Sequence, residues 1–288
     1  MGQLKLAVCL GGGIIVQMLT GSSAMAVQLD RGPLVLTFSE EFTGDGLDIY
    51  HPVHRPTGKW KTKYDHGDQK GASSRILNDE LQVYSDLEFN EVDPFAIADG
   101  VLSIRASKLQ RLADPRNKDR QFASGLITSS PSFHQAYGYF EMRARLPIGD
   151  GLWPAFWLLA PYHPDITAPQ YPGEIDVVEL LGRDASTIYC SVHWPTRPDF
   201  GEKKSTTLSV RSQAGSWRSY GVLWTKQHLV WYVDDAEVAR TPNPGLHRPM
   251  YILVNLAIGG SWGGPPSSKT IFPADFKIDY IRAYRGAD

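Results

Sequence analysis

The sequence has little cysteine and little net charge, and both shortages narrow what the protein can be. Two cysteines, Cys9 and Cys190, stand among 288 residues, so a disulfide framework cannot hold the chain together. The 29 Lys and Arg residues nearly balance the 31 Asp and Glu residues, for a formal net charge of -2. This balance leaves no basic footprint for a polyanion, which argues against a nucleic-acid partner.

A long apolar run is also missing. Lys5 precedes an apolar run over residues 6–19, but three glycines interrupt it, and it is shorter than the roughly 20 residues that span a bilayer. Ala24-Met25-Ala26 then provides the alternating small residues that a signal peptidase accepts. We therefore predict a signal peptide over residues 1–26 and a secreted or periplasmic mature chain. After cleavage we expect a monomer that is not bound to the membrane.

Cleavage after Ala26 would leave Cys190 as the one thiol of the mature chain. Cys190 alternates with Ile188 and Val192, as a small buried side chain in a strand would. We interpret it as a core residue and not as a reactive nucleophile. Stability must then come from a hydrophobic core, which about 260 residues can supply.

Strands dominate the pattern of the mature chain. The 27 glycines and 20 prolines indicate many turns, and apolar residues recur at every second position from end to end. The clearest case is 139–146, whereas 251–258 is apolar on both faces apart from Asn255, as in a central strand of stacked sheets. No mature segment has ten residues of helical periodicity. We predict an all-β sandwich, with residues 27–288 as a single domain.

Three carboxylates lie close together in the segment GEIDVVELLG (173–182). In a regular strand Glu174 and Asp176 share a face, whereas Glu179 points to the other face. A β-bulge at Val177-Val178 would bring all three carboxylates to one face, and bulges are common beside active sites. The local sequence therefore predicts a bulged strand with a row of acids.

Two kinds of site use such a row. Glycosidic bond hydrolysis needs one ionised carboxylate as nucleophile and one protonated carboxylic acid as proton donor, and neighbouring like charges separate the two pKa values. A calcium site also takes clustered carboxylates, and a solvated face of a strand can carry them without any ligand. The tryptophans nearby favour the first reading, because indole faces stack on sugar rings. They are Trp153, Trp157 and Trp194.

At this point the chain resembles glycoside hydrolase family 16, the laminarinase-like endo-β-glucanases. GEIDVVELLG matches that family's bulged E-x-D-x-x-E signature, and further segments of the pattern follow in order over nearly the whole mature chain. These segments are FSEEF (38–42), NDELQVYS (78–85), SGLITS (124–129), YGYFEMRARLP (137–147), GLWPAFWLL (151–159), HWP (193–195), WYVDD (231–235), NLAIGG (255–260) and IDYIRAY (278–284).

The resemblance implies a concanavalin A-like β-jelly-roll sandwich of two antiparallel sheets, with a substrate cleft across the concave face. It also implies retaining hydrolysis of internal β-1,3 or mixed β-1,3/1,4 glucan linkages, with no cofactor for catalysis. By position, Glu174 matches the nucleophile, Asp176 the assisting acid and Glu179 the general acid/base. Positions matching the sugar-binding subsites are Trp153, Trp157, His193, Trp194, Asn255 and Glu80.

Many family members bind a structural calcium ion on the convex face. The matching positions here are Glu41, the Gly100 carbonyl and Asp279, which offer the hard oxygen ligands that calcium prefers. One departure from the family pattern is Asp235, which stands where a hairpin glycine is usual. Aspartate tolerates the left-handed conformation better than most residues, so we expect the turn to persist.

Other functions remain open on the sequence alone. One is a β-glucan-binding protein without catalysis, although a binder has no need of three like charges beside its sugar platform. Another is a relative that transfers the glycosyl unit or cuts a bacterial exopolysaccharide or galactan. A sulfated galactan would require basic cleft residues, for which Arg183, Arg197 and Arg248 are the candidates.

Overall fold

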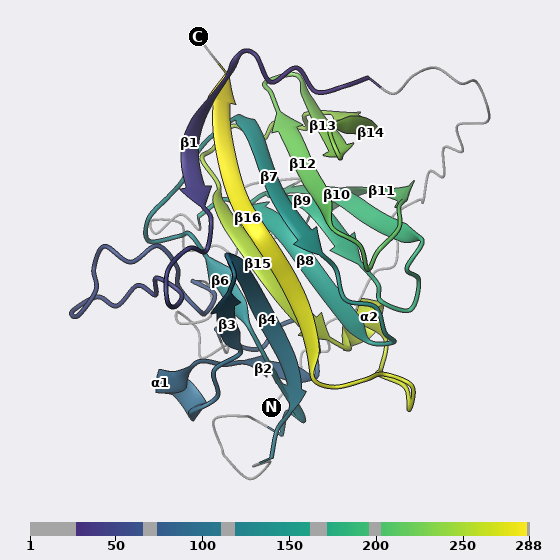
Figure 1. Ribbon diagram of the computed structural model, residues 1–288. Helices are drawn as coiled ribbons and strands as arrows, with labels where there is room; N and C mark the ends of the chain where they lie inside the picture. The colour runs from purple at the N-terminus through teal and green to yellow at the C-terminus, as the bar shows by residue number, and fades with distance from the viewer. Residues whose placement is uncertain (1–26, 66–73, 111–118, 162–171, 196–202, 287–288) are drawn as a thin grey trace, which may run out of the picture.

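Two stacked β-sheets form the protein in the computed structural model, which describes residues 27–65, 74–110, 119–161, 172–195 and 203–286 (Figure 1). The predicted signal peptide lies outside the described residues. No helix among these residues is long and apolar enough to cross a membrane. The two helices of the described chain are single turns, α1 (Leu87–Asn90) and α2 (Gly260–Gly263). The all-β prediction is therefore confirmed.

The larger sheet contains the chain's last strand near its centre, where β16 (Ala274–Gly286) runs between β7 and β4 and also pairs with β1 (Figure 1). Its strand order is β14 (Ala236–Pro242), β13 (His228–Val233), β12 (Arg218–Trp224), β7 (Gly138–Arg145), β16, β4 (Val101–Lys108), β5 (Phe122–Ser124) and β2 (Gln82–Tyr84), with β1 (Leu34–Glu40) beside β16 and β3 (Phe95–Ala98) beside β4. The pair β2 and β5 at the edge is parallel, whereas the other strand pairs of this sheet are antiparallel.

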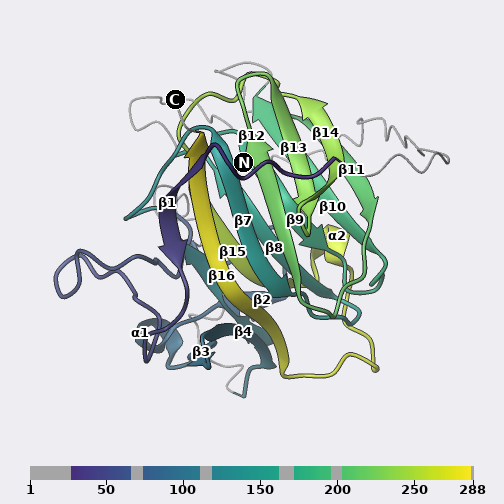
Figure 2. The ribbon, with the colours of Figure 1, turned by 45° about the horizontal axis from the view of Figure 1, so that its top comes forward.

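The smaller sheet carries the acidic segment, and the turned view shows it behind the larger sheet (Figure 2). Its order is β11 (Lys203–Arg211), β10 (Thr187–Pro195), β9 (Glu174–Leu180), β8 (Leu152–Leu159), β15 (Tyr251–Ile258) and β6 (Leu126–Thr128). All of its pairs are antiparallel. The acidic strand β9 therefore lies inside the sheet, with β10 and β11 on one side and β8, β15 and β6 on the other. Strands on both sides hold its backbone in place.

The core between the sheets is formed by the apolar residues that occur at every second position of the strands. Phe140, Met142 and Ala144 on β7 are fully buried and belong to the same apolar cluster as the inward-facing residues of β8, β9 and β15. Cys190 lies in that cluster, and burial raises the pKa of its thiol far above its usual range. This placement confirms the interpretation of Cys190 as a core residue.

The hairpin between β13 and β14 keeps its turn without glycine. Asp234 and Asp235 have φ of 49° and 64°, the left-handed conformation that aspartate tolerates. The Asp235 carboxylate also accepts hydrogen bonds of 2.6 and 3.2 Å from Arg31. A glycine could make the turn but could not make this contact.

Candidate active site

A β-bulge in β9 brings the three acids of the signature to one face. Between Tyr189 and Ser191 on β10 the partners on β9 advance from Glu179 to Asp176. On the other side, the consecutive residues Phe156 and Trp157 of β8 pair with Val178 and Asp176. Val177 is therefore the additional residue, and the predicted bulge is confirmed.

Two side chains from the core side contact backbone carbonyls at the bulge. The indole of Trp231, on β13 of the opposite sheet, donates a hydrogen bond of 2.9 Å to the Asp176 carbonyl. The Cys190 thiol lies 3.5 Å from the Val177 carbonyl oxygen. Since unpaired buried carbonyls are costly, these contacts stabilise the conformation that aligns the acids.

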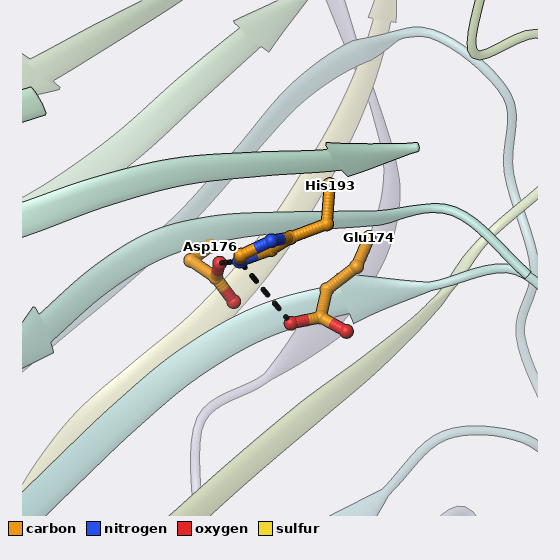
Figure 3. Close-up of side chains that lie close together, drawn as sticks. All are labelled: Glu174, Asp176 and His193. Carbon is orange, nitrogen blue, oxygen red and sulfur yellow. Dashed lines mark ion pairs between the residues drawn. The ribbon is translucent and has the colours of Figure 1, made fainter. Parts of the chain in front are cut away.

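His193 lies between the first two acids, as the close-up shows (Figure 3). Its Nε2 is 3.0 Å from Asp176 Oδ2 and 3.8 Å from Glu174 Oε1, and its Nδ1 is 2.5 Å from the Ser205 hydroxyl of β11. Burial opposes a charge on His193, but the hydrogen bond and charge of Asp176 outweigh it and raise the pKa. A protonated His193 would partly neutralise this end of the acidic row.

The same three side chains place potential ligand atoms within 4.8 Å of one another. They do not suit a calcium ion, because calcium takes six to eight oxygen ligands and an imidazole nitrogen occupies the space beside Asp176. Glu179, the third acid of the row, is also not a member of this cluster. The arrangement is that of an Asp176–His193 ion pair with the Glu174 carboxylate beside it.

Glu179 has the environment of a proton donor. Its side chain is 8% exposed, and burial together with the charge of Asp176 raises its pKa well above the usual range of a carboxyl. The Trp153 indole donates a hydrogen bond of 3.0 Å to Glu179 Oε1 and acts in the opposite direction. Burial and the charge of Asp176 both favour the protonated form of Glu179, which general acid catalysis requires.

A cavity of about 550 Å³ opens above these acids on the face of the smaller sheet. Its size fits part of an oligosaccharide. Its lining contains Glu174, Asp176 and Glu179 together with five of the six predicted substrate-binding residues, Trp153, Trp157, His193, Asn255 and Glu80.

A chain of hydrogen bonds joins the predicted residues on one side of the cavity. The Trp157 indole donates to Asn255 Oδ1 (2.8 Å), the Asn255 amide to the Tyr84 hydroxyl (2.9 Å), and that hydroxyl to Glu80 Oε2 (3.0 Å). Glu80 is 2% exposed, and burial raises its pKa to about 7. The chain thus links Trp157, Asn255 and Glu80, three residues of the cavity lining.

Trp194 is the exception among the predicted substrate-binding residues. It follows His193 on β10, so its side chain points to the opposite face of the strand. There it packs against the core between the sheets, and it is not among the cavity's lining residues. The expectation that Trp194 lines the cleft is therefore wrong, and the period of the strand is the reason.

Several residues of the cavity wall were missed by the sequence reasoning. Ser191 had a signal, because it shares a face of β10 with His193. Trp262 had a weaker one, an aromatic residue within the glycine-rich segment 259–264. Tyr64 and Lys203 had none, since they reach the cavity from a loop and from the start of β11.

The predicted calcium ligands are engaged by arginines on the larger sheet. The Glu41 carboxylate accepts hydrogen bonds of 2.7 and 2.8 Å from Arg282. Asp279, the additional residue of a bulge in β16, pairs with Arg143. Gly100 lies near the Glu41 carbonyl, but two guanidinium groups beside the carboxylates do not fit a cation site. The donor set thus does not support the predicted calcium ion.

Calcium addition tests this point. Because both carboxylates already have cationic partners, we expect the melting temperature to differ by less than about 1 °C between millimolar calcium and EDTA. Differential scanning fluorimetry measures the difference. A calcium-dependent rise of several degrees would contradict the arginine pairing and restore the predicted site.

Replacing Trp153 by phenylalanine tests the environment of Glu179. The variant retains an aromatic ring but loses the N–H that stabilises the Glu179 carboxylate, so the pKa of Glu179 should rise further. Because Glu179 must be protonated to donate, the alkaline limb of the pH–rate profile should move to higher pH. A profile that stays in place, or moves to lower pH, would contradict the assigned hydrogen bond.

Comparison with known proteins places the chain in a family. Residues 90–282 match the model of glycosyl hydrolases family 16. The chain is 39% identical over 272 residues to endo-1,3-1,4-beta-glycanase EglC of Rhizobium meliloti (strain 1021), covering 91% of this chain and 54% of that protein. It is 30% identical over 266 residues to a beta-glucanase of Rhodothermus marinus, covering 87% and 85%. The chain thus spans about half the length of the Rhizobium relative, but most of the Rhodothermus one.

The fold agrees with solved structures. An endo-beta-1,3-glucanase from Pyrococcus furiosus aligns with a TM-score of 0.72 at 26% identity, over 91% of this chain and 98% of that one. A laminarinase catalytic domain from Thermotoga petrophila RKU-1 aligns with a TM-score of 0.70 at 28% identity, over 91% and 100%. The match to the family model, the bulged acidic strand and the jelly-roll sheets agree, and the chain belongs to glycosyl hydrolases family 16.

Proposed function

We propose that the protein is an endo-acting, retaining β-glucanase that hydrolyses internal β-1,3 or mixed β-1,3/1,4 linkages. The observation that carries the proposal is the Val177 bulge, which places Glu174, Asp176 and Glu179 in one cavity with Glu179 buried and its pKa raised. The names of the Rhizobium and Rhodothermus relatives agree with this substrate class. A binding protein would gain nothing from three like charges at this place.

The reaction would proceed in two displacements. Glu174 attacks the anomeric carbon while Glu179 donates its proton to the glycosidic oxygen, so the leaving sugar departs as an alcohol and a glycosyl ester forms on Glu174. Glu179, now a carboxylate, then removes a proton from a water molecule that attacks the same carbon. This step frees Glu174 and restores the proton of Glu179.

Asp176 and His193 would support the first displacement. Asp176 lies on the same face as Glu174, and its ion pair of 3.0 Å with His193 Nε2 helps to fix its orientation. Its charge helps to keep the proton on Glu179 until the substrate arrives. When Glu174 becomes an ester, the acidic row loses one charge, and Glu179 can more easily become the carboxylate that the second step needs.

The arginines considered for a sulfated substrate support the neutral glucan instead. Arg183 donates to the carbonyls of Trp262 and Gly263, and Arg248 donates to the carbonyl of Pro161. Both guanidinium groups are thus turned to backbone oxygens. Arg197, the third candidate, lies outside the described residues.

The proposal extends to export and assembly. Residues 1–26 would direct the chain to the periplasm or the medium and would be removed, leaving 27–288 as a monomeric catalytic domain. In support, the carbonyl of Val27 accepts a hydrogen bond of 2.8 Å from Glu237, so the new first residue would already be docked. N-terminal sequencing of the exported protein and light scattering in solution test the two parts.

A substrate panel tests the activity. The purified protein should release a ladder of oligosaccharides from laminarin or lichenan and little from agarose or sulfated galactans. Release of monosaccharides alone would contradict endo action. Binding of laminarin without any cleavage would favour the non-catalytic alternative.

A further inference from the structure

Trp153, Trp262 and Tyr189 form a cluster of rings beside Glu179. Trp262 of α2 packs edge-to-face on Trp153 of β8, with ring centroids 5.3 Å apart and planes at 84°. It also contacts Tyr189 of β10 at 5.0 Å and 62°. Tyr189 is the register partner of Glu179, and Trp153 donates its hydrogen bond to the Glu179 carboxylate. The orientation of the Trp153 indole therefore depends on where Trp262 sits.

The segment that carries Trp262 is held at its start by a hydrogen bond of 2.8 Å from the Gly259 N–H to the Gly151 carbonyl, and the rest of it is mainly glycine. Four of the six residues from 259 to 264 are glycines, and Gly259, Gly260 and Gly264 have φ between 70° and 78°. Glycine loses the most backbone freedom on ordering, and α2 is a single turn without a side-chain cap. A Cβ on Gly260 or Gly263 would lie 3.4 Å from the Trp153 ring, so the glycines allow close packing but contribute no side chain that could anchor the segment.

Arg183 supplies the anchor. Its Nη1 donates hydrogen bonds of 2.9 Å to the Trp262 carbonyl and 2.7 Å to the Gly263 carbonyl. Hydrogen bonds from a charged donor are stronger than neutral ones. Arg183 lies in the turn that follows β9, four residues after Glu179, so it ties the glycine-rich segment to the strand that carries the acid/base.

From this arrangement we propose that Arg183 is a positioning residue for the general acid/base. By holding the carbonyls of Trp262 and Gly263, it keeps the Trp262 ring against Trp153 and so keeps the Trp153 N–H on Glu179. Arg183 touches neither the substrate nor the carboxylates in this role. The catalytic part of the inference rests on the proposed function of Glu179, whereas the aromatic packing does not.

The test compares Arg183→Ala with Arg183→Lys and with Arg240→Ala. Arg240 is a matched control, because it pairs with Glu237 on β14 of the other sheet. For Arg183→Ala we expect kcat/KM to fall roughly 10- to 100-fold, as misplacement of a catalytic group does. The alkaline limb of its pH–rate profile should move to higher pH, in the same direction as for Trp153→Phe. Lysine, which can also donate to both carbonyls, should restore most of the activity, and Arg240→Ala should behave as the wild type.

A second readout needs no turnover. Two indoles in edge-to-face contact give an exciton signal in circular dichroism, and Arg183→Ala and Trp262→Phe should both lose it while their melting temperatures stay close to wild type. The two changes combined should cost no more activity than either alone, since they break the same contact. If the protein cleaves no glucan but the signal depends on Arg183, the proposed function fails and the packing role stands.

An Arg183→Ala variant with the wild-type exciton signal and the wild-type alkaline limb would show that Trp262 and Trp153 keep their places without the guanidinium. A fall in melting temperature and activity without movement of the limb would show a merely structural role. If Arg183→Ala does not fold, Arg183→Lys and Trp262→Phe still test the inference. The exciton signal and the alkaline limb of the pH–rate profile are measured for both.

Discussion

Glu174→Gln and Glu179→Gln should each lower kcat by about 10³-fold or more while leaving the fold intact. The first removes the nucleophile of the proposed reaction. The second replaces a carboxylic acid that can give up a proton by an amide that cannot. Both amides fit the space of the carboxyl group, so the jelly-roll sheets should keep their wild-type circular dichroism and melting temperature.

The two variants should differ in how they respond to substrate and to added nucleophile. With an aryl glycoside whose leaving group needs no proton, a Glu179→Ala variant should still form the glycosyl ester, and azide should then restore turnover with retention of configuration. A Glu174→Ala variant should react with azide from the opposite face and give the inverted glycosyl azide. Glu237→Gln, on the hairpin of the larger sheet, is the matched control. Substantial activity in Glu174→Gln would end the assignment.

Arg31→Met should lower the stability of the protein more than the removal of an arginine from an ion pair at the surface. Arg31 donates hydrogen bonds of 3.1 and 2.7 Å to Glu141, whose side chain is 0% exposed. Without Arg31, Glu141 retains the hydrogen bond of 3.1 Å from the Tyr284 hydroxyl but loses its counter-charge. Breaking such a pair costs about 3 to 5 kcal/mol for fully buried partners.

The expected loss is smaller here, because the Arg31 side chain is 39% exposed and solvent screens its charge. We expect a decrease of about 2 to 3 kcal/mol in the free energy of unfolding, or roughly 5 to 10 °C in melting temperature. Arg105→Met is the matched control, because Arg105 pairs with Asp275 at the surface and should change stability by less than about 1 kcal/mol. Equal losses in the two variants would contradict a special role for the Arg31–Glu141 pair.

A double variant separates charge from packing. Glu141→Gln removes the buried charge that Arg31→Met leaves behind, so it should recover part of the stability when both changes are combined. Thermal and urea unfolding measure the recovery. If the double variant is less stable than Arg31→Met alone, the Glu141 carboxylate stabilises the fold through contacts other than the one with Arg31.

The bulge in the catalytic strand could be predicted from the sequence, because a regular strand would point Glu174 and Glu179 to opposite faces. Glu174 and Glu179 can share a face only if one residue is added between them, so the spacing itself required the bulge that Val177 makes. The contacts that stabilise the bulge could not be predicted, since Trp231 reaches the Asp176 carbonyl from the opposite sheet. The topology of the two sheets, and not the local sequence, decides which strand faces the bulge.

The errors have a common physical cause, because the sequence gives a residue's type but not the direction of its side chain. The family resemblance implies that Trp194 lies in the cleft, but the period of the strand sends its side chain to the face opposite that of His193. Glu41 and Asp279 were assigned to a cation site, and arginines from neighbouring strand positions occupy them instead. Trp262 was overlooked because its position depends on Arg183, which lies 79 residues away in the chain.

The most direct test of the central claim is the anomeric configuration of the first product. Proton NMR of the wild-type protein acting on laminarin or lichenan, recorded within the first minutes, should show the β-anomer of the new reducing end before mutarotation. That result is the signature of a double displacement through Glu174 with Glu179 as acid/base. Initial release of the α-anomer, or no new reducing end from either glucan, would contradict it.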